Sequence, residues 1–274
     1  MTDILVFGKG YIGSTTASFF NCPVMEDHIV TMEDIQDKID EYKPKIIIDS
    51  IGHLSKTTDD CEKDKTATLR DFVHIPLLLA EAALRNDIKL VHISNGAIYK
   101  YSDKNTVPIP EDALPDFHET LYARAKIYIE AALNSLSEAA NILTVRVLHP
   151  LSYVPHPRNI LTRLLKYRKV TSSPVSITYM PDFLMALKFL LKVDAEGVYN
   201  VVNYGGLKYP ELLEEYRKFD IHYNYAIMDP VELMLIRTHP VLATDKLEET
   251  GFPVRDIHDV LRECCDQYWE NVKK

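Results

Sequence analysis

Short apolar runs alternate with amphipathic stretches along this chain. The runs predict buried strands at residues 3–7, 23–25, 45–49, 90–93, 143–147 and 198–202. Apolar positions at helical spacing predict helices at 14–21, 32–42, 62–86 (bent at Pro76), 121–136, 159–168, 210–219, 230–236 and 256–272. Strands and helices that alternate at this interval form right-handed crossovers, so we expect an α/β fold with a doubly wound parallel sheet. The pattern loosens after Pro150, and we divide the chain into a domain at 1–153 and a smaller lobe at 154–274, interleaved with late strands of the sheet.

Composition narrows the class of protein. The net charge of −9 argues against a nucleic-acid partner, since no positive field offsets phosphate repulsion. The four cysteines lack C-x-x-C spacing and the ten histidines lack ligand spacing, so we expect reduced thiols and no metal. No apolar run approaches the ~18 residues of a membrane helix, and the first residues lack signal-peptide features. We therefore expect a cytoplasmic protein with no membrane partner.

A glycine-rich loop follows the first predicted strand. Gly8-Lys9-Gly10-Tyr11-Ile12-Gly13 is a G-x-G-x-x-G that opens a predicted helix, which is the context in which this pattern binds a dinucleotide. Its glycines permit a tight turn and close approach of the backbone to a pyrophosphate, and the helix N-terminus offers N–H donors. We predict a Rossmann-type domain that binds NAD(P), with these six residues and Gly52 as cofactor-binding residues.

The choice between NADP(H) and NAD(H) stays open. Glu26 or Asp27, after the second predicted strand, would favour NAD(H) by repelling a 2′-phosphate, whereas Lys9 would attract that phosphate.

Tyr122 and Lys126 form a Y-x-x-x-K on a predicted helix. Positions i and i+4 share one helix face, so the ammonium lies near the phenol, favours its ionised form and prepares it to donate a proton to a carbonyl oxygen. A second copy, Tyr204 to Lys208, contains two glycines that disfavour a helix. We therefore predict that Tyr122 and Lys126 are catalytic and that Lys126 also holds the nicotinamide ribose.

The two motifs together resemble the extended short-chain dehydrogenase/reductases. Further segments resemble the dTDP-4-dehydrorhamnose reductase family, and within it the nucleotide-rhamnose synthase branch of 3,5-epimerase/4-reductases. These segments are residues 59–62, 93–99, 111–112, 145–147, 157–159 and 197–200, with Arg237 and 246–247. The resemblance implies a smaller C-terminal substrate-binding lobe, a nucleotide-diphosphate sugar as substrate, and a homodimer formed through the helices that carry Y-x-x-x-K.

The resemblance also implies roles for individual residues. Asn95 stands where the superfamily has a serine or threonine, and its amide, with the neighbouring Ser94 hydroxyl, is expected to polarise the substrate ketone. The substrate diphosphate is expected to face cationic and amide side chains, namely Arg158, Asn159, Arg163 and Arg237.

Two departures from the branch concern epimerisation. Ala97 stands where the branch has a cysteine, and Arg163 where it has a lysine; a methyl group cannot transfer protons and a guanidinium does not deprotonate in proteins. We predict an NAD(P)H-dependent 4-reductase of a nucleotide-linked 4-keto-6-deoxyhexose that has lost the epimerase residues. Two alternatives remain, namely a bifunctional 3,5-epimerase/4-reductase that uses other acid/base groups, and a non-catalytic nucleotide-binding regulatory subunit.

Overall fold

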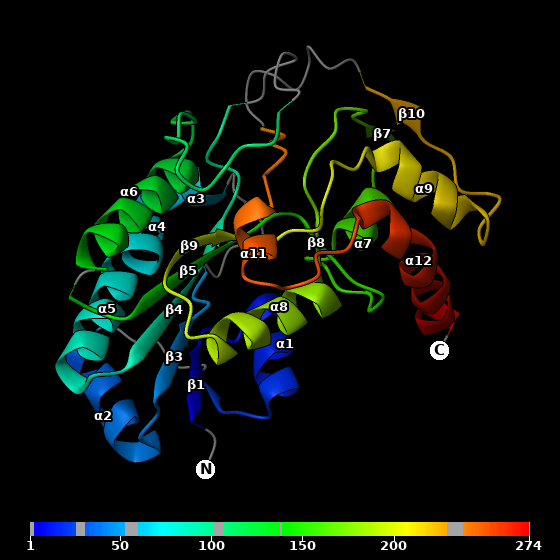
Figure 1. Cartoon of the computed structure of the whole chain (residues 1–274). Helices are drawn as coiled ribbons and strands as arrows, with labels where there is room; N and C mark the ends of the chain where they lie inside the picture. Colours follow the sequence, from blue (N-terminus) through cyan, green and yellow to red (C-terminus); the bar gives the residue numbers. More distant parts are fainter. Residues whose placement is uncertain are drawn as a thin grey trace. The chain divides into compact units, whose positions relative to one another are not determined.

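The computed structural model describes residues 3–25, 31–52, 60–100, 107–137, 139–228 and 238–273, and they form a Rossmann-like α/β fold (Figure 1). The main sheet has six strands in the order β2-β1-β3-β4-β5-β9. They are β1 (Ile4–Phe7), β2 (Val24–Met25), β3 (Ile46–Asp49), β4 (Lys89–Asn95), β5 (Ile142–Val147) and β9 (Gly197–Asn200). The pairs β1–β2, β1–β3 and β3–β4 are parallel, which confirms the predicted fold class.

Helices flank this sheet on both sides. Figure 1 shows α2 (Met32–Tyr42), α5 (Ile75–Asn86) and α6 (Leu121–Leu136) on one side and α1 (Tyr11–Phe20) on the other. Leu5, Ile47 and Leu90 pack with the first group in one apolar cluster. Successive strand residues point to opposite faces, so the equally buried Val6 and Ile48 face the other way. A sheet buried on both faces explains the continuous apolar runs in the sequence.

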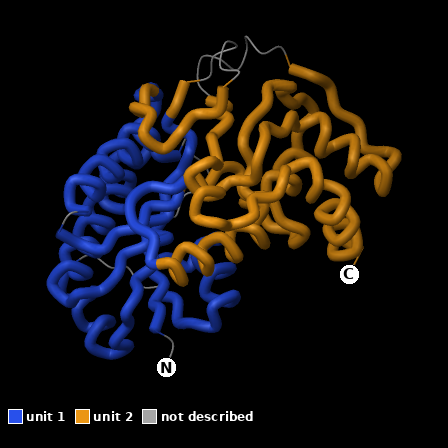
Figure 2. The backbone as a smooth tube through the Cα atoms, viewed as in Figure 1, with its two compact units in different colours: residues 1–98, 117–145, 194–199 blue, residues 99–116, 146–193, 200–274 orange. Residues whose placement is uncertain are grey.

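The chain divides into two compact units that are discontinuous in sequence (Figure 2). Unit 1 comprises residues 1–98, 117–145 and 194–199, and unit 2 comprises residues 99–116, 146–193 and 200–274. These units are defined by how densely their residues contact one another. The predicted boundary after residue 153 instead separates a cofactor-binding domain from a substrate-binding lobe, and it stays a prediction.

Unit 2 contains short helices and two-stranded sheets. Its helices are α7 (Ile160–Leu164), α8 (Met180–Lys192), α9 (Tyr209–Arg217), α11 (Asp245–Glu249) and α12 (Ile257–Lys273). Its strand pairs are β6 (Pro150–Leu151) with β8 (Thr178–Tyr179), and β7 (Lys169–Val170) with β10 (Ala226–Ile227).

The predicted helix at 62–86 is divided in the structure. It consists of α3 (Asp60–Lys63), α4 (Lys65–Leu69), one turn of π-helix η1 (Arg70–His74) and α5. The predicted bend at Pro76 therefore takes the form of a wider turn just before it, because proline has no N–H to continue the α-helical bonding. Helix α8 was not predicted, and the predicted helix at 230–236 lies outside the described residues.

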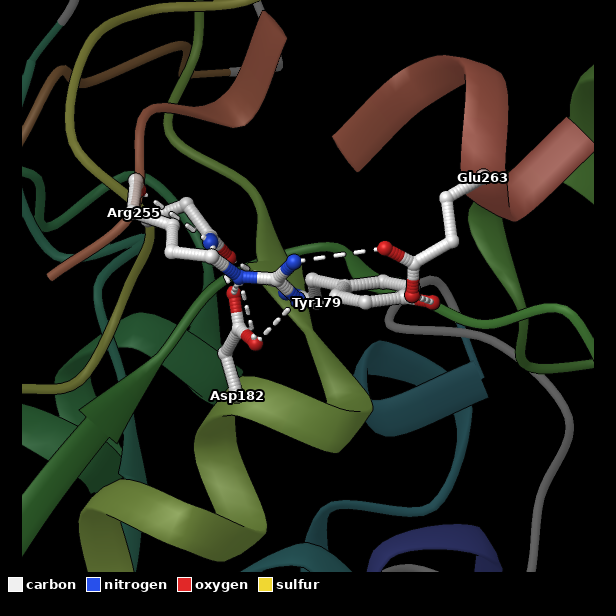
Figure 3. Close-up of polar contacts among 5 residues, drawn as sticks. Tyr179, Asp182, Arg255 and Glu263 are labelled. Atoms are coloured by element: carbon white, nitrogen blue, oxygen red, sulfur yellow. Dashed lines mark hydrogen bonds and ion pairs between the residues drawn. The ribbon is translucent and has the colours of Figure 1, made fainter. Parts of the chain in front are cut away.

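An arginine in unit 2 connects α8 with α12 (Figure 3). The Arg255 guanidinium donates to Asp182 on α8 at 2.6 Å and to Glu263 on α12 at 3.3 Å. Its Cζ lies 5.6 Å from the ring centroid of the buried Tyr179, whose hydroxyl donates to Glu263 at 3.2 Å. A planar guanidinium can pair with two carboxylates and stack on a ring at once, so Arg255 links the first turn of α8 to the second turn of α12.

Candidate functional site

The glycine loop of unit 1 lies where β1 and β3 end. Gly8 has a φ of +103°, and a Cβ there would lie 2.5 Å from the carbonyl oxygen of Ser50, directly after β3. A Cβ on Gly13 would lie 1.9 Å from the carbonyl oxygen of Gly8. Because β1 has β2 on one side and β3 on the other, this loop marks the point where the strand order reverses, at which doubly wound sheets bind ligands.

The N-terminus of α1 can hold an anion. Gly10 is the N-cap residue, no side chain caps the first turn, and no acidic residue lies in it. A Cβ on Gly10 would meet nothing within 4 Å, so its surroundings are open. A helix start with this opening fits a dinucleotide pyrophosphate.

Other predicted cofactor-binding residues fall around this loop. Lys9 is exposed, Tyr11 and Ile12 begin α1, and Gly52 lies exposed three residues after β3. Glu26 and Asp27, which bear on the choice between NAD(H) and NADP(H), lie outside the described residues.

Tyr122 and Lys126 share one face of α6. The Thr120 side chain accepts from the N–H of Ala123 and starts this helix two residues before Tyr122. Both side chains contact Phe72, since the Tyr122 and Phe72 ring centroids lie 5.2 Å apart with perpendicular planes and the Lys126 Nζ lies 5.1 Å from the Phe72 centroid. The second copy is not helical, because Tyr204 forms an isolated β-bridge with Asp256 and Lys208 only caps α9.

Lys126 is a buried cation. It is 4% exposed, and its Nζ donates to the carbonyl oxygen of Ile93 at 3.1 Å. Burial lowers the pKa of Lys126, while the carboxylates of Asp49 and Glu130 oppose this shift. Its charge therefore depends on these two anionic neighbours.

Ser94 and Asn95, at the end of β4, point to different surroundings. The buried Ser94 hydroxyl donates its hydrogen bond to Glu130 on α6, so it has no second proton to donate to a ligand. The Asn95 Oδ1 accepts from the N–H of Ala97 at 2.7 Å, which fixes the amide and leaves its Nδ2 as the donor without a hydrogen-bond partner among the described residues. Asn95, rather than Ser94, can offer a proton to a ligand.

The substrate residues predicted for unit 2 have unequal surroundings. Arg158 and Arg163 are exposed, with Arg163 on α7, and Arg237 lies outside the described residues. Asn159 is fully buried; its Nδ2 donates to the carbonyl oxygens of Ser152 and Val154 at 2.6 and 2.9 Å. Its Oδ1 accepts from the N–H of Leu161 at 3.1 Å. The Asn159 side chain holds its own loop and starts α7.

A cluster that we did not predict lies near Arg163. His149, two residues beyond the end of β5, has a φ of +43° and a buried Nε2 for which the described residues offer no hydrogen-bond partner. Its ring lies 5.9 Å from that of Tyr209, which lies 6.2 Å from that of His239. The position after a parallel strand is the one available sequence signal, because ligands bind at that edge.

Acid is expected to destabilise the fold through His149. Burial lowers the pKa of His149 from 6.5 to about 3, and His239 and Arg163 add to this shift. Between these two values the unfolded chain binds a proton that the folded protein does not. The free energy of unfolding should therefore fall by about 1.4 kcal/mol for each pH unit below 6.5 and show no contribution from His149 above it.

Urea unfolding of the wild type and of His149→Asn across pH 3 to 6.5 measures this contribution. Asparagine tolerates a positive φ, so the variant retains the backbone and loses only the imidazole. The variant should lose less stability on acidification than the wild type. Equal slopes for the two proteins would show that His149 is not responsible.

Several residues that carry the family resemblance have structural roles in unit 2. The Arg146 Nη1 donates to the Tyr99 hydroxyl at 2.8 Å and to the carbonyl oxygen of Glu111 at 3.2 Å. The Glu111 carboxylate accepts from the N–H of Asn200 at 2.9 Å. These residues tie the 99–116 segment to the ends of β5 and β9.

Neither a metal site nor a membrane-spanning helix is found among the described residues. No group of three His, Cys, Asp or Glu side chains in the described part of the chain is arranged to hold a metal ion. None of the helices among these residues combines the length and the apolar character needed to cross a bilayer.

Comparison with known proteins supports the predicted resemblance. The model of the NAD dependent epimerase/dehydratase family matches residues 4–183. A trifunctional UDP-glucose 4,6-dehydratase/UDP-4-keto-6-deoxy-D-glucose 3,5-epimerase/UDP-4-keto-L-rhamnose-reductase of Arabidopsis thaliana is 30% identical over 231 residues, 78% of this chain and 34% of that protein. The chain thus spans about a third of the length of this relative. The bifunctional dTDP-4-dehydrorhamnose 3,5-epimerase/dTDP-4-dehydrorhamnose reductase of the same plant is 26% identical over 79% of this chain and 75% of its own.

Solved structures share the fold. The L780 UDP-rhamnose synthase of Acanthamoeba polyphaga mimivirus has a TM-score of 0.86 at 22% identity, over 96% of this chain and 99% of its own. The dTDP-4-dehydrorhamnose reductase of Bacillus anthracis, solved in complex with NADP, has a TM-score of 0.78 at 18% identity, over 95% and 97%. Together with the sequence relatives, these similarities confirm the resemblance inferred from the sequence.

Proposed function

Because this chain belongs to the NAD dependent epimerase/dehydratase family, we propose that it is an NAD(P)-dependent oxidoreductase that reduces the 4-keto group of a nucleotide-linked 4-keto-6-deoxyhexose. The product would be a rhamnose-type nucleotide sugar. The relatives named above include reductases of UDP-linked and dTDP-linked substrates, so both nucleotides are candidates.

The observation that carries the proposal is the pairing of a phenol with a buried ammonium on one face of α6. Tyr122 and Lys126 contact the same Phe72 ring, and Lys126 is bonded to β4 two residues before Asn95. All of these residues, and the glycine loop, belong to unit 1. One compact unit thus carries a proton donor, a cation that acidifies it and an amide donor.

The residues divide the reduction between them. When bound, the reduced nicotinamide supplies the hydride to C4. Tyr122 donates its proton to the C4 oxygen, so that the ketone becomes a hydroxyl group. Lys126 stabilises the phenolate that remains, and the Asn95 Nδ2 donates a hydrogen bond to the oxygen as charge develops on it. We retain for Ser94 only an indirect part, since its hydroxyl is bonded to Glu130.

The absence of epimerase activity is part of the proposal. The position of the expected cysteine is occupied by Ala97, whose only described polar contact is its N–H with Asn95. The position of the expected lysine is occupied by Arg163, a permanent cation on α7. A substrate that has already been epimerised at C3 and C5 would then be required.

We assign the diphosphate of the substrate to unit 2. Arg158 and Arg163 present exposed guanidinium groups, which suit phosphate oxygens through their planar fork. Asn159 lies between these two arginines in sequence. It positions them because its side chain holds the loop that precedes α7 and caps the start of that helix. Arg237 keeps the same role as a prediction from the sequence.

The test is the oxidation of NADPH and of NADH with UDP-linked and dTDP-linked 4-keto-6-deoxyglucose, with and without a separate 3,5-epimerase. We expect turnover only when the epimerase is present, and no exchange of the C3 and C5 hydrogens in deuterated water without it. Turnover or exchange without the epimerase would establish the bifunctional alternative, which the names of the relatives favour. Cofactor binding without turnover of any substrate would point to a regulatory subunit.

A homodimer also remains a prediction. Leu77, Leu84 and Tyr128 are 36%, 47% and 58% exposed, and they lie on α5 and α6. Exposed apolar side chains on these helices are compatible with pairing through the helix that carries Tyr122 and Lys126.

A further inference from the structure

The space between α6 and the sheet changes from apolar to polar towards the carboxyl ends of the strands. Near the middle of the sheet, Ile129 and Leu133 of α6 pack in one cluster with Ile47 and Leu90. Closer to the carboxyl ends of these strands the same face carries polar side chains. They stand two residues after Ile47 on β3, and two and four residues after Leu90 on β4. These side chains and their partners on α6 are all at most 4% exposed, namely Asp49, His92, Ser94, Lys126 and Glu130.

Hydrogen bonds connect the members of this buried polar layer. His92 lies opposite Asp49 in the β3–β4 pairing, and its Nδ1 lies 2.7 Å from the Asp49 Oδ2. The Asp49 Oδ1 accepts from the N–H of Ile51 at 3.0 Å. The Ser94 hydroxyl donates to the Glu130 carboxylate, which lies one helical turn beyond Lys126 on α6. Both carboxylates are thus held in place by residues of the sheet.

The groups around Lys126 determine its charge. The elements packed around Lys126 present titratable side chains. The sheet presents Asp49 from β3 and His92 from β4, and α6 presents Tyr122 and Glu130. Helix α3 presents Cys61, and η1 presents Asp71, which is paired with Arg70. A buried ammonium is disfavoured by loss of its hydration, and nearby carboxylates offset that loss. The two carboxylates whose field reaches Lys126 are those of Asp49 and Glu130.

We propose that Glu130, fixed by Ser94, is a positioning residue that keeps Lys126 in its charged form beside Tyr122, with Asp49 as a second anionic support. The proposal rests on the proton-donor role proposed for Tyr122 and adds the groups that make that role possible. Without the carboxylates Lys126 would lose its proton, and the phenol would lose the cation that acidifies it.

The direction in which the pKa of Tyr122 shifts in Glu130→Gln tests this proposal. Along the helix axis Glu130 lies about 6 Å from Lys126 and about 12 Å from Tyr122, so its direct effect on the phenol is the smaller one. If Glu130→Gln acted on Tyr122 directly, loss of an anion would lower the pKa of the phenol. If it acts through Lys126, loss of the cation raises that pKa, by about one unit or more. Glutamine retains an acceptor for Ser94, so the hydrogen bond is preserved.

The measurement is a titration of tyrosinate absorbance in the protein without substrate. Tyr122 is isolated by subtracting the curve of the matching Tyr122→Phe protein, in the wild type and in Glu130→Gln. We expect ionisation at higher pH in Glu130→Gln, a smaller shift of the same sign in Ser94→Ala, and none in Glu81→Gln, which removes an exposed carboxylate paired with Arg85 on α5. A downward shift, or none, in Glu130→Gln would overturn the proposal.

Two further results keep the proposal separate from folding and from the proposed function. If Glu130→Gln does not fold, as judged by circular dichroism, Asp49→Asn is titrated instead and the same upward shift is expected. If no 4-keto sugar is turned over but the titration shifts as described, the proposed function fails and this inference stands. If the sugar is turned over and the titration does not shift, only this inference fails.

Discussion

Tyr122→Phe is expected to lose about 10²–10⁴-fold in kcat for reduction, while the affinity for NADPH stays within about twofold. The substitution removes one hydroxyl oxygen and leaves the ring, whose centroid lies 5.2 Å from that of Phe72. The packing of α6 should therefore persist, and only the proton donor is lost. The measurement is single-turnover oxidation of bound NADPH with whichever 4-keto sugar is turned over in the assay proposed above, together with a fluorescence titration of NADPH.

Tyr128→Phe is the matched control for this variant. Tyr128 lies on the same helix and is 58% exposed, so loss of its hydroxyl should leave the rate unchanged. A rate in Tyr122→Phe equal to that of the wild type would assign proton donation to another group. An equal loss in both variants would indicate a general effect on α6.

Gly13→Ala is expected to lose stability, whereas Gly10→Ala is expected to remain stable and to lose affinity for NADPH. A Cβ on Gly13 would lie 1.9 Å from a backbone oxygen of Gly8, which cannot rotate away, so we expect a loss of about 3 kcal/mol in the free energy of unfolding. Gly10 has a φ of −72°, and a Cβ there meets nothing within 4 Å. Gly10→Ala should therefore fold with a loss under about 1 kcal/mol.

The cofactor should distinguish the two positions. If the pyrophosphate lies over the start of α1, the methyl group of Gly10→Ala occupies its place, and NADPH should bind at least about tenfold more weakly in a protein that is otherwise stable. Urea unfolding and NADPH fluorescence measure the two effects. Normal NADPH binding by Gly10→Ala would contradict the assigned cradle, and normal stability of Gly13→Ala would show that the loop relaxes.

Local signals made the N-terminal part of the fold predictable. The run before Gly8 has few alternatives, because a glycine-rich turn between a short apolar segment and a helix fits only a strand–turn–helix unit. Helix α8 was missed because nine of its thirteen residues are apolar, a proline stands near its start, and only Asp182, Lys188 and Lys192 mark its polar face.

The site was predictable where side-chain direction follows from regular structure. The i, i+4 spacing of Tyr122 and Lys126 places both on one face of α6. The same reasoning separates Ser94 from Asn95, since neighbours on a strand point to opposite faces, and we expected both at one ketone. Asn159 illustrates the limit, because a sequence does not tell an amide that binds a ligand from one that binds its own loop.

The two units alternate along the chain, so neither unit can be completed during synthesis before part of the other has been made. The chain passes from one unit to the other after residues 98, 116, 145, 193 and 199. Strand β9, at the outer edge of the main sheet, therefore leaves the ribosome only after two segments of unit 2, through α8, have been made. Until then the outer edge of β5 is unpaired, and an unpaired edge is where a nascent chain most readily aggregates. Co-translational assembly of this protein is thus tied to one four-residue strand near the end of unit 1.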